Sequence, residues 1–240
     1  MSRGDNPPEK KSARGRRRKH TARLTSNKPT RPTGEAAKRL PRGEAVRALV
    51  RRAALECFGA FGFEGTSTRA VAAHADISHS LLLYHFKSKD ELWRATMSEV
   101  IQHYLEQLAQ RMDQAGGDDP AGQLRAFVEH FIRYSARVPQ LHRIMTQQST
   151  QGSERIEWLV ENYLRDAFAS MCDIIERGQA AGSVLPGEPG RIYYAIVGLA
   201  GTLLSVSTEF RLLTGRDVFT EPEIQRTIAF VDAFLFIAGP

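Results

Sequence analysis

Ser78, His79 and Ser80 form the first turn of a short predicted helix, residues 78–86. Hydroxyl and imidazole groups donate and accept hydrogen bonds, and the base edges exposed in the major groove of DNA offer matching donors and acceptors. A second short helix, residues 66–75, is predicted just before it because a capping residue precedes an apolar pattern of helical period. The spacing therefore predicts a helix-turn-helix whose second helix reads DNA.

The polar and aromatic side chains of this segment are the candidate DNA contacts. Those at the start of the first helix lie where free backbone N–H groups also attract phosphate. Tyr84 and His85 are expected to be shared between the core and the DNA, with lysines at the rim. The predicted contacts are Thr66, Ser67, Arg69, Ser78, His79, Ser80, Tyr84, His85, Lys87 and Lys89.

The two helices must also pack against each other. The small alanines on the inner face of the first helix allow a close approach, and the residues expected to face inward are Val71, Ala72, Ala75, Leu82 and Phe86. The turn between the helices needs a residue that tolerates a left-handed conformation. Asp76 occupies that place, and aspartate is one of the few residues other than glycine that adopts this conformation readily.

The charge of the chain is concentrated before this segment. Residues 1–42 hold 14 of the 33 lysines and arginines but only 3 of the 27 acidic residues. This arm has almost no large apolar residues, so it is predicted to be disordered. Two interpretations stay open: the basic run 14–19 enters the minor groove or follows phosphates beside the site, or the arm is a solvated tail attracted to any polyanion.

The remaining pattern predicts an all-α protein of about nine helices and no strand. We expect a disordered basic arm (1–42), a three-helix DNA-binding domain (43–88) and a helical domain (89–240). The first helix runs from Glu44 to Gly62 with Phe58 and Phe61 in its apolar stripe. The others are expected near 66–75, 78–86, 88–112, 120–136, 138–150, 154–181, 190–213 and 221–238.

The segment resembles the DNA-binding region of the TetR family of bacterial transcriptional repressors over about 45 residues. The matching residues are Ala53, Ala54, Phe58, Gly62, Thr66, Ser67, Val71, Ala72, Ala75, Ile77, Ser78, Leu82, His85, Phe86, Ser88, Lys89 and Leu92. The family usually has glycine where this chain has Asp76. It often has a phosphate-binding tyrosine where this chain has Leu83, and here the aromatic residue follows at Tyr84.

The resemblance implies that the helical domain binds a small-molecule effector and forms a homodimer on a palindromic operator. Candidate ligand contacts are Phe127, His130, Tyr134, His142, Trp158, Tyr163, Met171 and Tyr194, which together suggest an apolar cavity with a few hydrogen-bonding groups.

Apolar side chains cover much of the circumference of the last helix. One stripe contains Ile224, Ile228, Val231 and Leu235, and another contains Phe230, Phe234 and Ile237. Such a helix needs two packing partners, so we expect it to lie in the dimer interface. On this prediction, a charge at Val231 separates the subunits.

Other classes of function find little support. The seven histidines and two cysteines show no metal-site or catalytic spacing, so we expect no enzyme, metal or cofactor. No apolar run reaches the roughly 18 residues of a membrane span, so a cytoplasmic protein without membrane contact is expected. The main alternative is a DNA-binding regulator or architectural protein without small-molecule control; control by a partner protein is a third.

Overall fold

A computed structural model describes residues 42–116 and 118–237. The predicted arm lies outside these residues except for Arg42, which begins the first helix. The first helices are α1 (Arg42–Gly65), α2 (Thr68–His74), α3 (His79–His85), α4 (Lys89–Ala115), α5 (Pro120–Arg137) and α6 (Pro139–Gln151). They are followed by α7 (Glu154–Leu159), a π-helical turn η1 (Val160–Leu164), α8 (Arg165–Ala180), α9 (Pro189–Ser205), α10 (Ser207–Thr214) and α11 (Glu221–Leu235).

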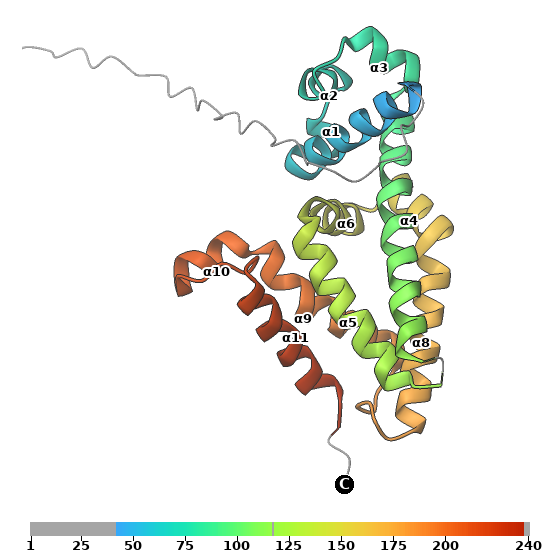
Figure 1. Ribbon diagram of the computed structural model, residues 1–240, viewed down its shortest axis with the longest axis vertical. Helices are drawn as coiled ribbons and strands as arrows, with labels where there is room; N and C mark the ends of the chain where they lie inside the picture. Colours follow the sequence, from blue (N-terminus) through green and yellow to red (C-terminus); the bar gives the residue numbers. More distant parts are fainter. Residues whose placement is uncertain (1–41, 117, 238–240) are drawn as a thin grey trace, which may run out of the picture. The chain divides into compact units, whose positions relative to one another are not determined.

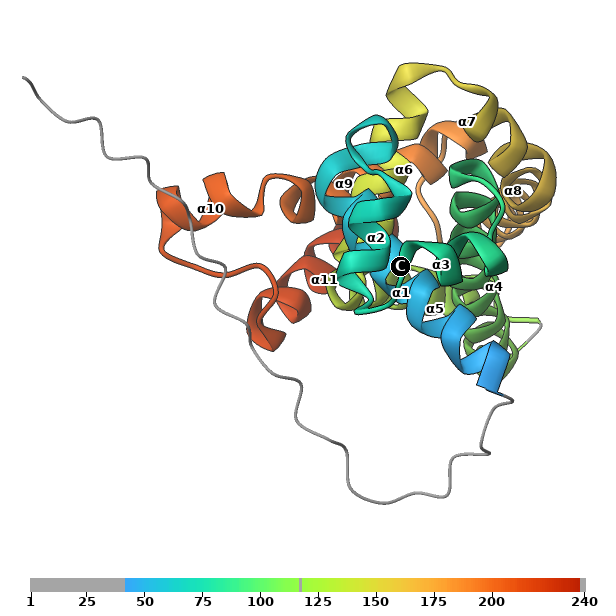
Figure 2. The same ribbon diagram turned by 90° about the horizontal axis from the view of Figure 1, so that it is seen from above.

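The described residues confirm the all-α prediction and contain one helix more than the nine expected. The helix predicted at 154–181 is continuous through α7, η1 and α8, so it counts once. The helix predicted at 190–213 is instead two helices, because Val206 leaves the helical conformation (φ −101°, ψ 27°). There α10 turns by 69° from α9, and Figure 2 shows it extending away from the other helices.

The helix α5 lies in the middle of the body, where it contacts α4, α6, α8, α9 and α11. The long helix α4 connects this body with α1, α2 and α3, which gather at its N-terminal end (Figure 1). A second link is made by α6, which contacts both α1 and α9. Two helices therefore connect the predicted DNA-binding segment with the rest of the chain.

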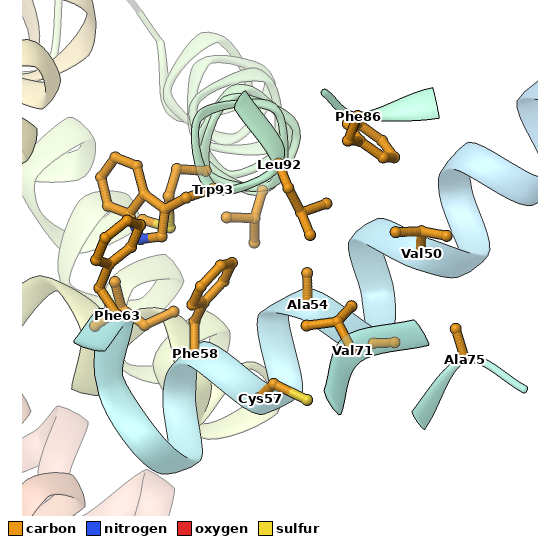
Figure 3. Packing of buried hydrophobic residues seen from close by; sticks show 14 of the residues in the cluster. Val50, Ala54, Cys57, Phe58, Phe63, Val71, Ala75, Phe86, Leu92 and Trp93 are labelled. Carbon is orange, nitrogen blue, oxygen red and sulfur yellow. The ribbon is translucent and has the colours of Figure 1, made fainter. Parts of the chain in front are cut away.

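The first hydrophobic core fills the space between α1, α2, α3 and the first half of α4 (Figure 3). Phe58, Leu92 and Trp93 are fully buried in it, and Trp93 contacts Trp158 of α7 at a ring distance of 6.0 Å. The core thus continues from the helix-turn-helix into the helical body. The predicted domain boundary at residues 88 and 89 stays a proposal.

The second hydrophobic core joins the C-terminal half of α4 to α5, α8, α9 and α11. Among its members are Leu124, Ile175 and Ile196, all fully buried. The stripe of α11 that contains Val231 and Leu235 packs into this core. One face of α11 is therefore used within the subunit.

The end of α1 differs from the prediction. Gly62 does break the helix, with φ at 69°, but Phe61 is 67% exposed. The break redirects the chain so that Phe63 turns inward, where its ring lies 5.9 Å from that of Phe58 and 6.4 Å from that of Trp93. The predicted apolar stripe therefore ends at Phe58, and Phe63 takes the inward position that was expected for Phe61.

Candidate functional site

The helices α2 and α3 form the predicted helix-turn-helix. Asp76 has φ at 54°, so the turn contains the left-handed residue that was expected there. Ser78 caps α3 by accepting a hydrogen bond from the backbone N–H of Leu81 (3.2 Å). Thr68 Oγ1 and His79 Nε2 lie 2.9 Å apart, which ties the start of α2 to the start of α3. These contacts set the angle at which α3 leaves the turn.

The helix α3 has two faces of different character. Leu82 and Phe86 are fully buried, as the spacing predicted. Ser80 and Tyr84 point away from the core, and Tyr84 is 80% exposed. The hydroxyl groups of Ser78 and Ser80 lie 3.1 Å apart at the N-terminal end of this outer face. A helix held by one face and open on the other is suited to insertion into a groove of DNA.

Most of the predicted DNA contacts lie on the accessible surface of this segment. The exposed ones are Ser67, Arg69, Ser78, Ser80, Tyr84 and Lys87, and the half-buried ones are His79, His85 and Lys89. That these side chains contact DNA stays a prediction.

Thr66 does not fit the role predicted for it. Its side chain is buried, with 3% exposed. Its hydroxyl group is 2.7 Å from the carbonyl oxygen of Gly62 and 3.1 Å from that of Cys57, and it donates to this pair. Thr66 therefore closes the break at the end of α1 instead of facing phosphate.

Lys89 is also directed elsewhere. Its ammonium group donates to the carbonyl oxygen of Phe63 (2.8 Å) and lies 4.1 Å from the centre of the Phe63 ring. These contacts hold the start of α4 against the end of α1. We therefore remove Lys89, like Thr66, from the proposed DNA contacts.

Arg47 is a positioning residue that was not predicted. Its guanidinium group donates to the carbonyl oxygen of His85 (3.1 Å) and lies 4.7 Å from the centre of the Phe86 ring. It thereby fixes the C-terminal end of α3 on α1. The helical pattern placed Arg47 on α1 but contained no signal for a partner 38 residues away.

The predicted ligand contacts do not form one group. Phe127 and Met171 belong to the second core. Trp158 and Tyr163 pack against the first core, and the Tyr163 hydroxyl donates to Ser98 Oγ (2.8 Å). The predicted ligand contacts are therefore divided between the two cores, and their role in ligand binding stays a prediction.

The structure brings His130 and Tyr134 together with Tyr104, which the prediction did not include. The Tyr104 ring lies 4.8 Å from the ring of His130 and 5.1 Å from that of Tyr134. The Tyr104 hydroxyl is buried and has no hydrogen-bond partner in the described part of the chain. The candidate ligand contacts included no residue of the helix predicted at 88–112, so Tyr104 was overlooked.

Tyr194 was predicted to face the ligand but is 66% exposed. Its neighbour Tyr193 turns inward instead, with its ring 6.0 Å from that of Phe127. Burial raises the pKa of Tyr193 to about 12, so its hydroxyl group stays protonated at neutral pH. Side chains of neighbouring residues on an α-helix point about 100° apart. The prediction therefore identified the correct helix but chose Tyr194 instead of Tyr193.

His142 connects two helices instead of facing a cavity. Its Nε2 lies 2.9 Å from Ser205 Oγ. The His142 ring also lies so close to Gly201 that it leaves no room for a Cβ on residue 201. Burial lowers the pKa of His142 below its usual value. The side chain fastens α6 to α9.

The stability of the body is expected to depend on pH through His130. Burial lowers its pKa to about 4, from roughly 6.5 in an unfolded chain. Neutral His130 therefore stabilises the fold above pH 6.5, and this contribution is lost as the pH falls toward 4. Chemical denaturation between pH 7 and pH 4 should show a smaller loss of stability for His130→Gln than for the unaltered protein. An identical pH profile would contradict this assignment.

The last helices expose apolar side chains in the single chain. On α11, Phe230 and Phe234 are exposed, while the stripe containing Val231 is buried inside the subunit. The helix ends at Leu235, so Ile237, which was predicted on the same stripe as these phenylalanines, lies beyond it and is also exposed. On α9, Gly198 has no atom within 4 Å of the position that a Cβ would take. The two stripes predicted for the last helix therefore have different surroundings. A charge at Val231 would disrupt the subunit core, so that predicted test of the interface is wrong.

Other kinds of site have little structural basis in the residues described. They contain no group of three or more metal-ligating side chains of the His, Cys, Asp or Glu type. Cys57 and Cys172 are free thiols. No single described helix is long and apolar enough to cross a membrane, although the bent pair α9 and α10 has the required length and composition when taken together.

Two family models match this chain. Residues 50–96 match the bacterial regulatory proteins of the tetR family, and residues 120–233 match the tetracyclin repressor-like C-terminal domain. The first match covers the larger part of α1, all of α2 and α3 and the start of α4, and the second covers most of the body.

Curated relatives and solved structures agree with these matches. The HTH-type transcriptional regulator RutR of Escherichia coli K12 is 23% identical over 80% of this chain and 89% of its own length. The HTH-type transcriptional regulatory protein RaaS of Mycobacterium tuberculosis is 30% identical over 65% of this chain and 69% of its own.

Among solved structures, a mutant of HlyIIR has a TM-score of 0.64 at 17% identity, covering 82% of this chain and 98% of that one. AibR, solved with isovaleryl coenzyme A and operator DNA, has a TM-score of 0.66 at 17% identity, covering 80% and 98%. With its helix-turn-helix and its helical body both matched, the chain belongs to the TetR family of bacterial transcriptional regulators.

Proposed function

We propose that this protein is a dimeric, ligand-responsive repressor that binds a palindromic operator and leaves it when a small molecule binds. The observation that carries the proposal is the two-faced helix α3, anchored by Leu82 and Phe86 and open at Ser80 and Tyr84. We assign base contacts to its first turn and phosphate contacts to Ser67, Arg69 and Lys87. On this proposal the protein is a cytoplasmic regulator and not an enzyme.

A dimer is supported by the exposed apolar face of α11 and by the bare surface of α9 at Gly198. Phe230 and Phe234 would be removed from water when the same face of a second subunit covers them. Two α3 helices would then lie about one turn of DNA apart, roughly 34 Å, and read a palindrome.

Control by a small molecule is supported by the unsatisfied hydroxyl of Tyr104. A buried hydroxyl without a partner is rare in a folded protein, because it gives up a hydrogen bond to water. A ligand with an acceptor group would supply that bond between α4 and α5. The alternative, a regulator without small-molecule control, is favoured by the close packing of the rings around Tyr104.

The outer face of α3 can be tested without disturbing its core. Ser80→Ala removes an exposed hydroxyl and is expected to weaken operator binding about tenfold, because a base or phosphate loses a hydrogen bond. Binding would be measured by fluorescence anisotropy at fixed salt. Ser170→Ala is the matched control, since Ser170 is an exposed serine on α8. Equal operator affinity for Ser80→Ala and the unaltered protein would remove Ser80 from the interface.

A further inference from the structure

A groove opens between α1 and α4, where the DNA-binding helices meet the body. Its volume is about 780 Å³, which is within the usual range for small-molecule sites. It is lined by α1 and α4, with Arg51, Arg52 and Ala45 on α1 and Glu99 and Val100 on α4, and by Tyr134 of α5. Only Tyr134 belongs to the predicted ligand contacts.

The groove contains a charged bridge between α1 and α4. The Arg51 guanidinium donates to Glu99 of α4 and, at 2.7 Å, to Glu44 of α1. The Arg51 side chain is largely shielded from solvent, so salt screens this bridge less than it screens a pair at the open surface. Whatever separates Arg51 from Glu99 weakens the attachment of α1 to α4.

A second arginine lies in the same groove without a compensating charge. Arg52 is exposed and has no ion pair or hydrogen bond in the described part of the chain. Leu49, Leu55 and Val100 supply an apolar floor beside it. A neighbouring hollow of about 420 Å³ contains the acid Glu106, together with Glu99. Of the two arginines that line the groove, Arg52 is therefore the one without an acidic partner among the described residues.

We propose that this groove binds a small amphipathic carboxylate, with its chain on the apolar floor and its head group at Arg52 and Arg51. Guanidinium groups pair with carboxylates through charge-assisted hydrogen bonds, and burial of the chain adds a hydrophobic contribution. A cationic or uncharged amphiphile would leave Arg52 without a partner. The proposal rests on the proposed function where it concerns release of DNA.

The helix α1 lines the groove and also packs against the core that holds α3, so a ligand in the groove can change the position of α3. A carboxylate at Arg51 competes with Glu99 and so loosens α1 from α4. The core that holds α3 includes Val50 and Ala54 of α1, so a shift of α1 carries α3 with it. The ligand then binds the state in which α1 is loosened from α4, and the operator binds the state in which α1 is attached to α4. Each is expected to lower the affinity for the other by the same factor.

Binding would be measured by isothermal titration calorimetry with decanoate below its micelle concentration. Decanol and decyltrimethylammonium would serve as uncharged and cationic probes of equal chain length. Arg52→Gln removes the head-group partner, and Ala45→Trp fills the groove from an exposed helical position. Arg165→Gln, an exposed arginine of α8 outside the groove, is the matched control.

Decanoate is expected to bind the unaltered protein and the Arg165→Gln control equally. Arg52→Gln and Ala45→Trp should each weaken binding about tenfold or more, as expected for loss of a charge-assisted hydrogen bond or of the cavity. Equal binding of decanol, or an unchanged affinity in either variant, would overturn the proposal. Operator binding without decanoate is measured separately, so a protein that binds DNA but not decanoate refutes the groove alone.

Discussion

Replacing Phe230 with glutamate is expected to separate the subunits and to lower operator affinity more than a hundredfold. Phe230 is 61% exposed on α11, so a glutamate there is solvated in the monomer and leaves the subunit fold intact. In a dimer the same charge would be buried against its symmetry mate, which costs several kcal/mol. Two α3 helices joined in one molecule would become two weak separate binders. Sedimentation equilibrium and operator binding would measure both effects.

Two further variants on α11 control this experiment. Gln225→Glu adds the same charge at an exposed position outside the aromatic stripe, so it should leave the dimer unchanged. Val231→Glu places the charge in the subunit core, where it should unfold the protein instead of producing a folded monomer. A Phe230→Glu protein that stays dimeric at micromolar concentration would exclude this face from the interface.

Truncation of Leu82 to alanine is expected to destabilise the protein by about 3 kcal/mol, the usual cost of a cavity at a fully buried leucine. Leu82 anchors α3, so operator binding should fall as well. Leu83→Ala is the matched control, because Leu83 is 39% exposed and its truncation should cost less than about 1 kcal/mol. Urea denaturation would measure both. Equal losses at the two positions would show that α3 is not packed as described.

The helix-turn-helix could be predicted because local rules decide it. Ser78 caps a helix that starts beside it, and Asp76 tolerates the conformation that its own turn requires. The buried pair Leu82 and Phe86 follows from the helical repeat alone. Each of these features depends on residues within a few positions along the chain.

The wrong predictions share a different cause, which is contact with distant parts of the chain. Lys89 was expected at the DNA surface, but the carbonyl oxygen and ring of Phe63 hold its ammonium group against α1. Arg47 was overlooked because its partner, the carbonyl oxygen of His85, belongs to another helix. The inward side of α9 was likewise decided by contact with another helix, because Tyr193 and not Tyr194 packs against Phe127 of α5.

The most direct test of the proposed function is a footprint of the purified protein on the DNA upstream of its own gene, at moderate salt with competitor DNA. The proposal predicts a protected palindrome whose half-sites lie about one helical turn apart, roughly 34 Å, with protection lost in Phe230→Glu. Binding that is diffuse, lowered steeply by salt and equal on unrelated DNA would contradict a sequence-specific regulator.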